Sequence, residues 1–509
     1  MALWACAAIL LAVGVLQASG APSQTVADLA AASNENPGPT VQGVAGPDGE
    51  VAEAPQGPAQ TSLREQGEGG LDTPLLPRLR SVLGMLLLGG IAWAFSVDRS
   101  NLAWRVVLWG IGLQLIFAFF ILKTPLGAGI FDWLNTVVVS LLGFTVEGAR
   151  FIFGDLVYNN VPVGLGEAGS NAPIQEVPGQ VARTGASFAF NVLPTIIFFS
   201  SLMTVLYHVG VMQWVVRAVA WVMQKTLHTS GAETLSAAGN IFVGQTEAPL
   251  MIKPFFEKMT MSELHAVMTG GFATVAGGVL AAYVGMLVAY FPDIAGHLIA
   301  ASVMSAPAAL VMAKLMYPED GEPVTKGQLK IELESPDVNV IDAASRGAGE
   351  GLGLALNVGA MLLAFIALIA MANALLGWGG SLVGLEGLSF QQILGWILAP
   401  LAWFMGVPWV DAVTVGSLLG IKTVVNEFVA YLELSSILQQ AQTLQPRSVI
   451  ISIYALSGFA NFSSIAIQLG GIGGLAPSRR HDLSKVGFRA MVAGSLAAFM
   501  TATVAGMLL

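Results

Sequence analysis

The chain has 509 residues, of which 55% are hydrophobic and only 11% are charged. A soluble domain carries about 25% charged residues, so a chain with a mean hydropathy of +0.71 cannot cover an ordinary aqueous surface. The net charge of -10 argues against a nucleic-acid partner, which would require a basic patch. Cys6 is the only cysteine, which excludes an intrachain disulfide and a cysteine-ligated zinc site. These properties predict an all-α polytopic membrane protein.

The first 77 residues differ from the rest of the chain. The apolar run 3–16 has the length of a signal-peptide h-region, and small residues follow it, so we predict a signal peptide at 1–20. A short N-terminal anchor is the alternative, because no Lys or Arg precedes the run. Residues 21–77 are rich in Ala, Gly, Pro and acidic residues and cannot bury enough apolar area to fold. We expect a disordered acidic extracytoplasmic tail there.

Eight apolar runs from residue 78 onward are long enough to span a membrane. They lie at about 81–97, 103–122, 187–208, 263–290, 294–316, 351–377, 447–466 and 486–508. Three further apolar stretches, of which the first two carry charged residues, are predicted to lie along the interface, near 129–147, 211–225 and 387–405. The basic loop 471–489 indicates a cytoplasmic side, and eight spans then place both termini outside. We divide this part into N-terminal spans with an interfacial helix at 78–180 and a transport core at 181–509.

Two other apolar stretches, 232–252 and 409–432, have polar residues in their middle, including Glu247 and Glu427. A carboxylate at membrane depth costs at least ~2.5 kcal/mol and is by default functional. Irregular backbone at that depth must be buried in protein or line a wet cavity. Because both stretches occupy matching places in two similar halves, we predict two re-entrant hairpins in an inverted-repeat transporter core. The alternative is that both acids are structural, and Lys422 is expected to be structural or to reach the interface.

Two more polar positions interrupt predicted spans. Phe459, Asn461 and Ser464 fall roughly on one helix face, where Asn and Ser can bond hydroxyl groups and Phe can form an apolar wall. Their alternative role is hydrogen bonding between helices. Thr274 lies among glycines that weaken its helix, so its hydroxyl and nearby carbonyls could ligate a hard cation such as Na⁺. The alternative is that the Thr274 hydroxyl forms a hydrogen bond within its own helix.

Four segments resemble the signature segments of the concentrative nucleoside transporters. They are GQTEAPL (Gly244–Leu250), MTGGFATVAGGVLAAYV (Met268–Val284), NEFVAY (Asn426–Tyr431) and GFANFSSIAIQLGG (Gly458–Gly471). The segments follow in the family's order, and the resemblance extends from about residue 80 to the C-terminus.

The resemblance implies a homotrimer of eight-span protomers, each importing purine and pyrimidine nucleosides together with Na⁺ across a cell membrane. On the nucleobase side of the substrate site it places Gln245, Thr246, Glu247 and Val279. On the ribose side it places Glu427, Phe459, Asn461 and Ser464. The implied Na⁺ site consists of Asn240, Val243, Thr274 and Val275, which contribute mainly backbone carbonyls together with the Asn and Thr side-chain oxygens.

Several alternatives stay open at this point. Members of the family that use protons exist, so a proton-coupled nucleoside symporter is one of them. A passive nucleoside channel and a membrane-embedded enzyme with Glu247 and Glu427 as an acid/base pair are the others. The sequence contains no nucleophile elbow, no phosphate-binding loop and no metal-ligand spacing among its five histidines. We therefore expect a transporter that is not an enzyme.

Overall fold

The computed structural model describes residues 74–158, 160–165, 175–183, 188–327, 337–382, 384–385, 387–439 and 444–509. The expected signal peptide at 1–20, and all but the last residues of the expected tail at 21–77, lie outside this part. The first described helix, α3 (Leu75–Ala94), begins before the expected boundary at residue 78. Leu75 and Leu76 are apolar and lengthen this helix at its N-terminal end.

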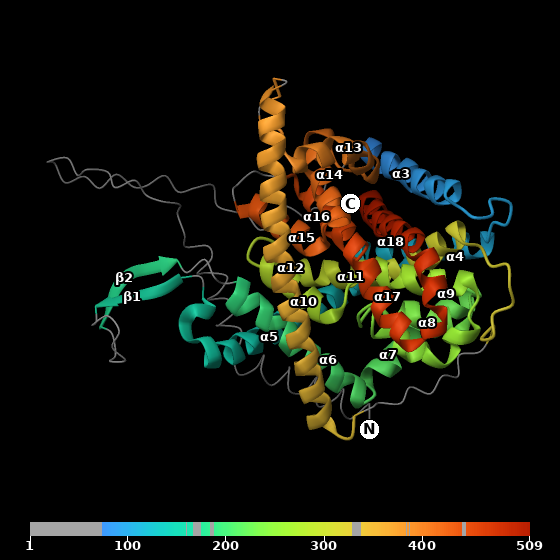
Figure 1. Cartoon of the computed structure of the whole chain (residues 1–509), viewed down its shortest axis with the longest axis horizontal. Helices are drawn as coiled ribbons and strands as arrows, with labels where there is room; N and C mark the ends of the chain where they lie inside the picture. Colours follow the sequence, from blue (N-terminus) through green and yellow to red (C-terminus); the bar gives the residue numbers. More distant parts are fainter. Residues whose placement is uncertain are drawn as a thin grey trace.

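Helices form nearly all of the described part of the chain (Figure 1). After α3 they are α4 (Trp104–Lys123), α5 (Pro125–Phe153), α6 (Leu193–His208), α7 (Val211–Leu227), α8 (Gly231–Gly239), α9 (Met261–Ala273), α10 (Gly277–Leu287), α11 (Ile294–Met316), α12 (Val340–Leu382), α13 (Phe390–Met405), α14 (Trp409–Val424), α15 (Glu427–Gln439), α16 (Pro446–Leu456), α17 (Phe462–Leu475) and α18 (Arg480–Leu508). The shorter helical segments are η1 (Gly154–Val157), η2 (Phe188–Val192), η3 (Ala248–Lys258) and η4 (Pro477–Arg479). The predicted helical membrane fold is confirmed, with one addition: an antiparallel pair of strands, β1 (Asn160–Leu165) and β2 (Gln175–Arg183), that projects from one side.

Eight helical segments of the described chain are long and apolar enough to cross a membrane, as the sequence predicted, but two assignments differ. The stretch 129–147, expected at the interface, belongs to the continuous segment Pro125–Val157. Its length and composition allow it to span a membrane and do not say where it lies, so the interfacial position of 129–147 stays a prediction. The stretch 447–466, expected as one span, is divided into α16 and α17, because Gly458 adopts a φ of +125° that ends the helical path.

The interior is built from α9, α10, α11 and α18, which are buried along most of their length. The helices α3, α4, α5, α6 and α12 bury only a small share of theirs, and α12 crosses the whole height of the molecule in Figure 1. Exposed apolar side chains on α12 include Leu363, Ile366 and Trp378. An apolar surface of this extent fits contact with lipid or with another protein chain.

The two interrupted segments each consist of two short helical pieces around a break. In the first, α8 ends at Gly239 and η3 begins at Ala248, which leaves 240–247 as the turn. In the second, α14 ends at Val424 and α15 begins at Glu427. A sharp bend of 115° between α13 and α14 leads into the second pair. Each pair is followed by a broken helix, α9–α10 in the first half and α16–α17 in the second, so the predicted repeated order is present.

Local sequence explains where the first hairpin begins and ends. Ser230 and Glu233 form a capping box at the start of α8, and Thr260 and Glu263 form another at the start of α9. Each box satisfies two backbone donors that a helix start leaves without partners. Glu233 also forms a buried ion pair with Lys314 at 2.8 Å, which fastens α8 to α11.

The breaks of the two broken helices lie against each other. A Cβ atom placed on Gly458 would come within 2.9 Å of the carbonyl oxygens of Phe272 and Ala273, the last residues of α9. Only glycine allows so close an approach of two backbones at this φ. The two halves of the chain therefore meet at the points where their helices are interrupted.

Candidate functional site

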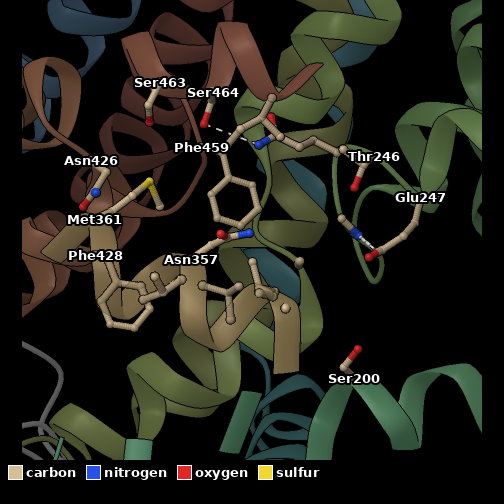
Figure 2. A pocket seen from close by; sticks show the side chains of 18 of the residues that line it. Ser200, Thr246, Glu247, Asn357, Met361, Asn426, Phe428, Phe459, Ser463 and Ser464 are labelled. Atoms are coloured by element: carbon tan, nitrogen blue, oxygen red, sulfur yellow. Dashed lines mark hydrogen bonds between the residues drawn. The ribbon is translucent and has the colours of Figure 1, made fainter. Parts of the chain in front are cut away.

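A cavity of about 520 Å³ lies where the two halves meet α12. Its walls come from the turn 240–247, from α10, from the start of α15, from the α16–α17 break and from α12. All eight residues predicted for the substrate site line it: Gln245, Thr246, Glu247, Val279, Glu427, Phe459, Asn461 and Ser464. Segments that are far apart in the sequence thus contribute to one concave site, as Figure 2 shows.

Glu427 is the best-anchored side chain of this cavity. It is buried, and its two carboxylate oxygens accept hydrogen bonds from Asn461 Nδ2 at 2.7 Å and from the Tyr283 hydroxyl at 3.1 Å. Glu427 begins α15, where the helix dipole favours a negative charge. Each carboxylate oxygen can accept more than one hydrogen bond, so the anchored group can still receive donors from a ligand.

The position of Asn461 follows from its role as the N-cap of α17. Its Oδ1 accepts the backbone N–H of Ser464 at 2.9 Å, which is a standard helix cap. With the oxygen used in this way, the amide nitrogen faces Glu427. The neighbouring Phe459 projects into the cavity between the turn with Thr246 and Glu247 and the side with Asn426 (Figure 2).

The first hairpin contributes its turn to the opposite wall. Glu247 is exposed toward the cavity, and its carboxylate accepts the backbone N–H of Gly244 in the same turn. Gln245 is buried and donates from Nε2 to the Ser464 hydroxyl at 3.4 Å. Val279 adds an apolar surface from α10. The two carboxylates therefore differ. Glu427 is held by side chains of other elements, whereas Glu247 is held by the backbone of its own turn.

Sequence reasoning missed the contribution of α12. Asn357 and Met361 line the cavity, as do Arg346 and Glu350 nearer the start of the helix. Arg346 pairs with Glu350 at 2.7 Å and also with Asp337. A polar Asn within an apolar span was the available signal, because polar groups at membrane depth mark pathways or binding sites.

The four residues predicted for Na⁺ converge where the turn 240–247 touches the α9–α10 break. Asn240 is 1% exposed, and neither its side-chain oxygen nor its nitrogen has a hydrogen-bond partner within the described chain. A Cβ on Gly270 would lie 3.3 Å from the Asn240 amide nitrogen, and the Gly270 carbonyl accepts the Thr274 hydroxyl at 2.9 Å. Val243 and Val275 are buried beside them.

This arrangement fits a hard monovalent cation. A buried amide without partners costs about 1–3 kcal/mol, and a cation would give its oxygen a partner. Thr274 already bonds to its own helix, as the structural alternative stated, yet its hydroxyl oxygen retains lone pairs for a ligand. Oxygen donors of this kind are those that hard cations take.

Lys422 is fully buried in α14, which agrees with a structural role. Its ammonium donates to the Ala455 carbonyl at 2.7 Å and lies 5.5 Å from the Phe499 ring centroid. Ala455 is in the last turn of α16, where carbonyls lack partners within the helix. The lysine thus supplies a hydrogen-bond donor at the second helix break.

Three family models match the chain in consecutive parts. They are described as "Na+ dependent nucleoside transporter N-terminus" at residues 83–156, "Nucleoside recognition" at 189–290 and "Na+ dependent nucleoside transporter C-terminus" at 297–506. Among curated proteins, the chain is similar to sodium/nucleoside cotransporter 1 of Rattus norvegicus, with 43% identity over 86% of this chain and 65% of the relative. The cotransporter 1 of Homo sapiens is 41% identical with the same shares. The chain therefore spans about 65% of the length of these relatives.

Solved structures agree in fold over almost their full length. "Structure of CNTnw in an inward-facing substrate-bound state" is 41% identical, with a TM-score of 0.73 over 84% of this chain and 97% of that chain. A doubly substituted form of the same protein in an outward-facing state is 42% identical, with a TM-score of 0.75 over 86% and 98%.

Proposed function

This chain belongs to the concentrative nucleoside transporter family, and from that premise we propose that it imports nucleosides across a membrane together with Na⁺. The observation that carries the proposal is the convergence of eight residues from distant segments on one cavity, around a buried carboxylate. The names of the relatives, sodium/nucleoside cotransporters, support the same substrate and ion. An enzymatic role has no such support.

The chemistry of the cavity suits a nucleoside. A volume of about 520 Å³ falls within the range of small-molecule sites. In the proposed pose, Glu427, Asn461 and Ser464 bind ribose hydroxyls and Phe459 packs beside the sugar. Charge-assisted hydrogen bonds are about twice as strong as neutral ones, so Glu427 contributes most. Gln245, Thr246, Glu247 and Val279 contact the base. Their amide, hydroxyl and carboxylate groups can serve different base edges, which permits purines and pyrimidines.

Na⁺ supplies the driving force in this proposal. It binds the oxygens of Asn240 and Thr274 with backbone carbonyls of Val243 and Val275. One Na⁺ moving inward through 100 mV supplies ~2.3 kcal/mol, and a tenfold Na⁺ gradient adds ~1.4 kcal/mol. The sum of ~3.7 kcal/mol is enough to accumulate a nucleoside several hundredfold.

Coupling follows from the position of the cation site in the chain. Asn240 and Val243 belong to the same turn as Gln245, Thr246 and Glu247, so an ion that orders the turn also orders the base-binding residues. A nucleoside then binds tightly only when Na⁺ is present. The unpartnered Asn240 amide supports this order, because it gives the ion a role that no described side chain fills.

The proposal extends to assembly and location. The protein functions as a homotrimer in a cell membrane, the inner membrane if the source is a Gram-negative bacterium. The exposed apolar residues of α12 support contact with lipid or neighbouring protomers. Both termini lie outside the cytoplasm, supported by the basic residues Arg479, Arg480 and Lys485 in η4 and the first turns of α18. The proposal also includes a signal peptide at 1–20 and an acidic tail at 21–77. The N-terminal spans at 78–180 then precede the transport core at 181–509.

Uptake of radiolabelled uridine and adenosine into proteoliposomes tests the proposal. We expect accumulation above the external concentration only under an inward Na⁺ gradient, and no accumulation when a Na⁺ ionophore dissipates that gradient. Protein-free liposomes are the control. Accumulation driven by a proton gradient alone would keep the substrate and overturn the ion. Equilibration without accumulation under either gradient would indicate a channel, and absence of uptake would overturn the substrate.

A further inference from the structure

A second buried glutamine lies directly behind the base side of the cavity. Gln468 is on α17 and is fully buried. Its Nε2 donates two hydrogen bonds, to the backbone carbonyl of Met268 at 3.1 Å and to Gln245 Oε1 at 3.0 Å. Gln468 does not line the cavity, so it has no direct contact with a bound molecule there.

The Met268 carbonyl fixes the direction of this chain of bonds. A backbone carbonyl can only accept, so the Gln468 amide must turn its NH₂ group toward α9. The same NH₂ group faces Gln245, so Gln245 must turn its oxygen toward Gln468. The Gln245 NH₂ group then points the other way, toward Ser464 and the cavity. One of its two N–H groups reaches the Ser464 hydroxyl at 3.4 Å, which leaves the second for a ligand.

The two amides lie close against the backbone of α9 at Gly271. A Cβ on Gly271 would lie 2.8 Å from Gln468 Nε2 and 2.9 Å from Gln245 Cβ. Glycine at 271 is therefore what allows the two side chains to reach each other across α9. The contact is built into the fold on three elements: the first hairpin, α9 and α17.

We propose that Gln468 is a positioning residue that fixes the Gln245 amide with its NH₂ group toward the cavity, so that the site selects nucleobase edges offering an acceptor at that place. This inference rests on the proposed function. Uracil presents acceptor oxygens on both sides of its ring N–H, and the other nucleobases also carry acceptors. A fixed donor is therefore compatible with breadth among bases, whereas a freely rotating amide would lose affinity for all of them.

A double-mutant cycle on uridine affinity tests the positioning role. The purified full chain, in detergent and saturating NaCl, is titrated with uridine by calorimetry as wild type, Gln245→Ala, Gln468→Leu and the double variant. We expect Gln468→Leu to weaken binding about 5- to 20-fold, as expected for the loss of a buried hydrogen bond. The double variant should match Gln245→Ala within about twofold, because Gln468 acts only through Gln245. Independent, additive losses, or unchanged affinity in Gln468→Leu, would overturn the proposal.

Gln114→Leu is the matched control for a general packing effect. Gln114 is also fully buried and donates to a backbone carbonyl, that of Met304 at 3.1 Å, and to the Thr501 hydroxyl at 3.3 Å, away from the cavity. We expect it to lower the melting temperature about as much as Gln468→Leu and to leave uridine affinity unchanged. An equal loss of affinity in both variants would mean that Gln468 is only a packing residue.

A reversed polarity gives a second test if Gln468→Leu does not fold. In Gln468→Glu the new side chain accepts from Gln245, which must then present its oxygen to the cavity. In the wild-type background, we expect Gln245→Ala to weaken uridine binding. In the Gln468→Glu background, we expect Gln245→Ala to leave uridine affinity unchanged or to raise it. The same loss of uridine affinity in both backgrounds would contradict the positioning of Gln245 by Gln468. Wild-type protein that binds no nucleoside would instead overturn the proposed function, and base selection by Gln468 with it.

Discussion

The two halves of the transport core have the same order of elements but complete their helix breaks differently. In the first half, the turn beside the α9–α10 break contains Asn240, whose buried amide has no partner in the described chain. In the second half, the Lys422 ammonium donates to the Ala455 carbonyl beside the α16–α17 break. One break therefore receives a hydrogen-bond donor from the protein, and the other has a polar group that remains unsatisfied. In our proposal, this difference is the reason that Na⁺ binds at the first half.

The two carboxylates follow the same contrast. Glu427 of the second half is buried and held by Asn461 and Tyr283, whereas Glu247 of the first half is exposed toward the cavity and bonded to its own turn. The second half thus presents a preformed anchor. The first half presents groups whose arrangement depends on the turn, and in our proposal on the ion.

The largest effect on uptake is expected from a substitution of Glu427, the preformed anchor. Glu427→Gln removes the charge and disturbs both anchoring bonds, so we expect Na⁺-driven uridine uptake to fall at least about 30-fold in kcat/KM. Uptake into proteoliposomes measures it. Glu433→Gln, the same change further along α15 and outside the cavity lining, is the control and should retain uptake. Similar losses of uptake in Glu427→Gln and Glu433→Gln would contradict the role of Glu427 as the anchor of the substrate.

A smaller effect is expected at the cation site of the first half. Asn240→Leu removes one oxygen ligand, so the Na⁺ concentration for half-maximal uptake should rise about tenfold. Maximal uptake at high Na⁺ should change less. Gln114→Leu controls for loss of a buried amide in general. An unchanged Na⁺ dependence would place the ion elsewhere, and the contrast between the halves would lose its functional meaning.

The substitution of Glu247, which is bonded to its own turn, should matter less than that of Glu427. Glu247→Gln preserves the shape of the side chain and removes a charge that partly faces the cavity, so we expect uridine affinity to weaken about fivefold. Calorimetry at saturating NaCl provides the comparison with Glu427→Gln. A loss as large as that of Glu427→Gln would show that both carboxylates are equally fixed when the nucleoside is bound.

The smallest effect on ion dependence is expected from Lys422→Met. The substitution leaves the Ala455 carbonyl without its donor, so the melting temperature should fall by roughly 2–4 °C. The Na⁺ concentration for half-maximal uptake should stay within about twofold of the wild-type value. If Lys422→Met shifts this concentration more than Asn240→Leu does, the external cation acts at the second half, and the comparison is reversed.

Sequence reasoning found the polar residues of the cavity because they lie in short, specific motifs whose character contradicts their apolar surroundings, and the resemblance to the family added Val279. It could not locate the break within 447–466, because hydropathy continues across Gly458 and only the backbone conformation shows the interruption. It predicted the span 351–377 but missed the contribution of α12 to the cavity, since Asn357 and Asn373 are isolated polar residues in a long apolar run. The β1–β2 hairpin lies in a stretch with Gly and Pro that gives no clear alternating pattern.

The contact between Gly458 and the end of α9 has a consequence for biogenesis. The carbonyls of Phe272 and Ala273 are synthesised and inserted long before residue 458 leaves the ribosome. Until the second broken helix arrives, the first one has an interrupted backbone in the bilayer without the neighbour that covers it, a costly state in hydrocarbon. Insertion of α16 and α17 is therefore the step that completes the first half, and chains arrested before it should be the preferred substrates of membrane quality control.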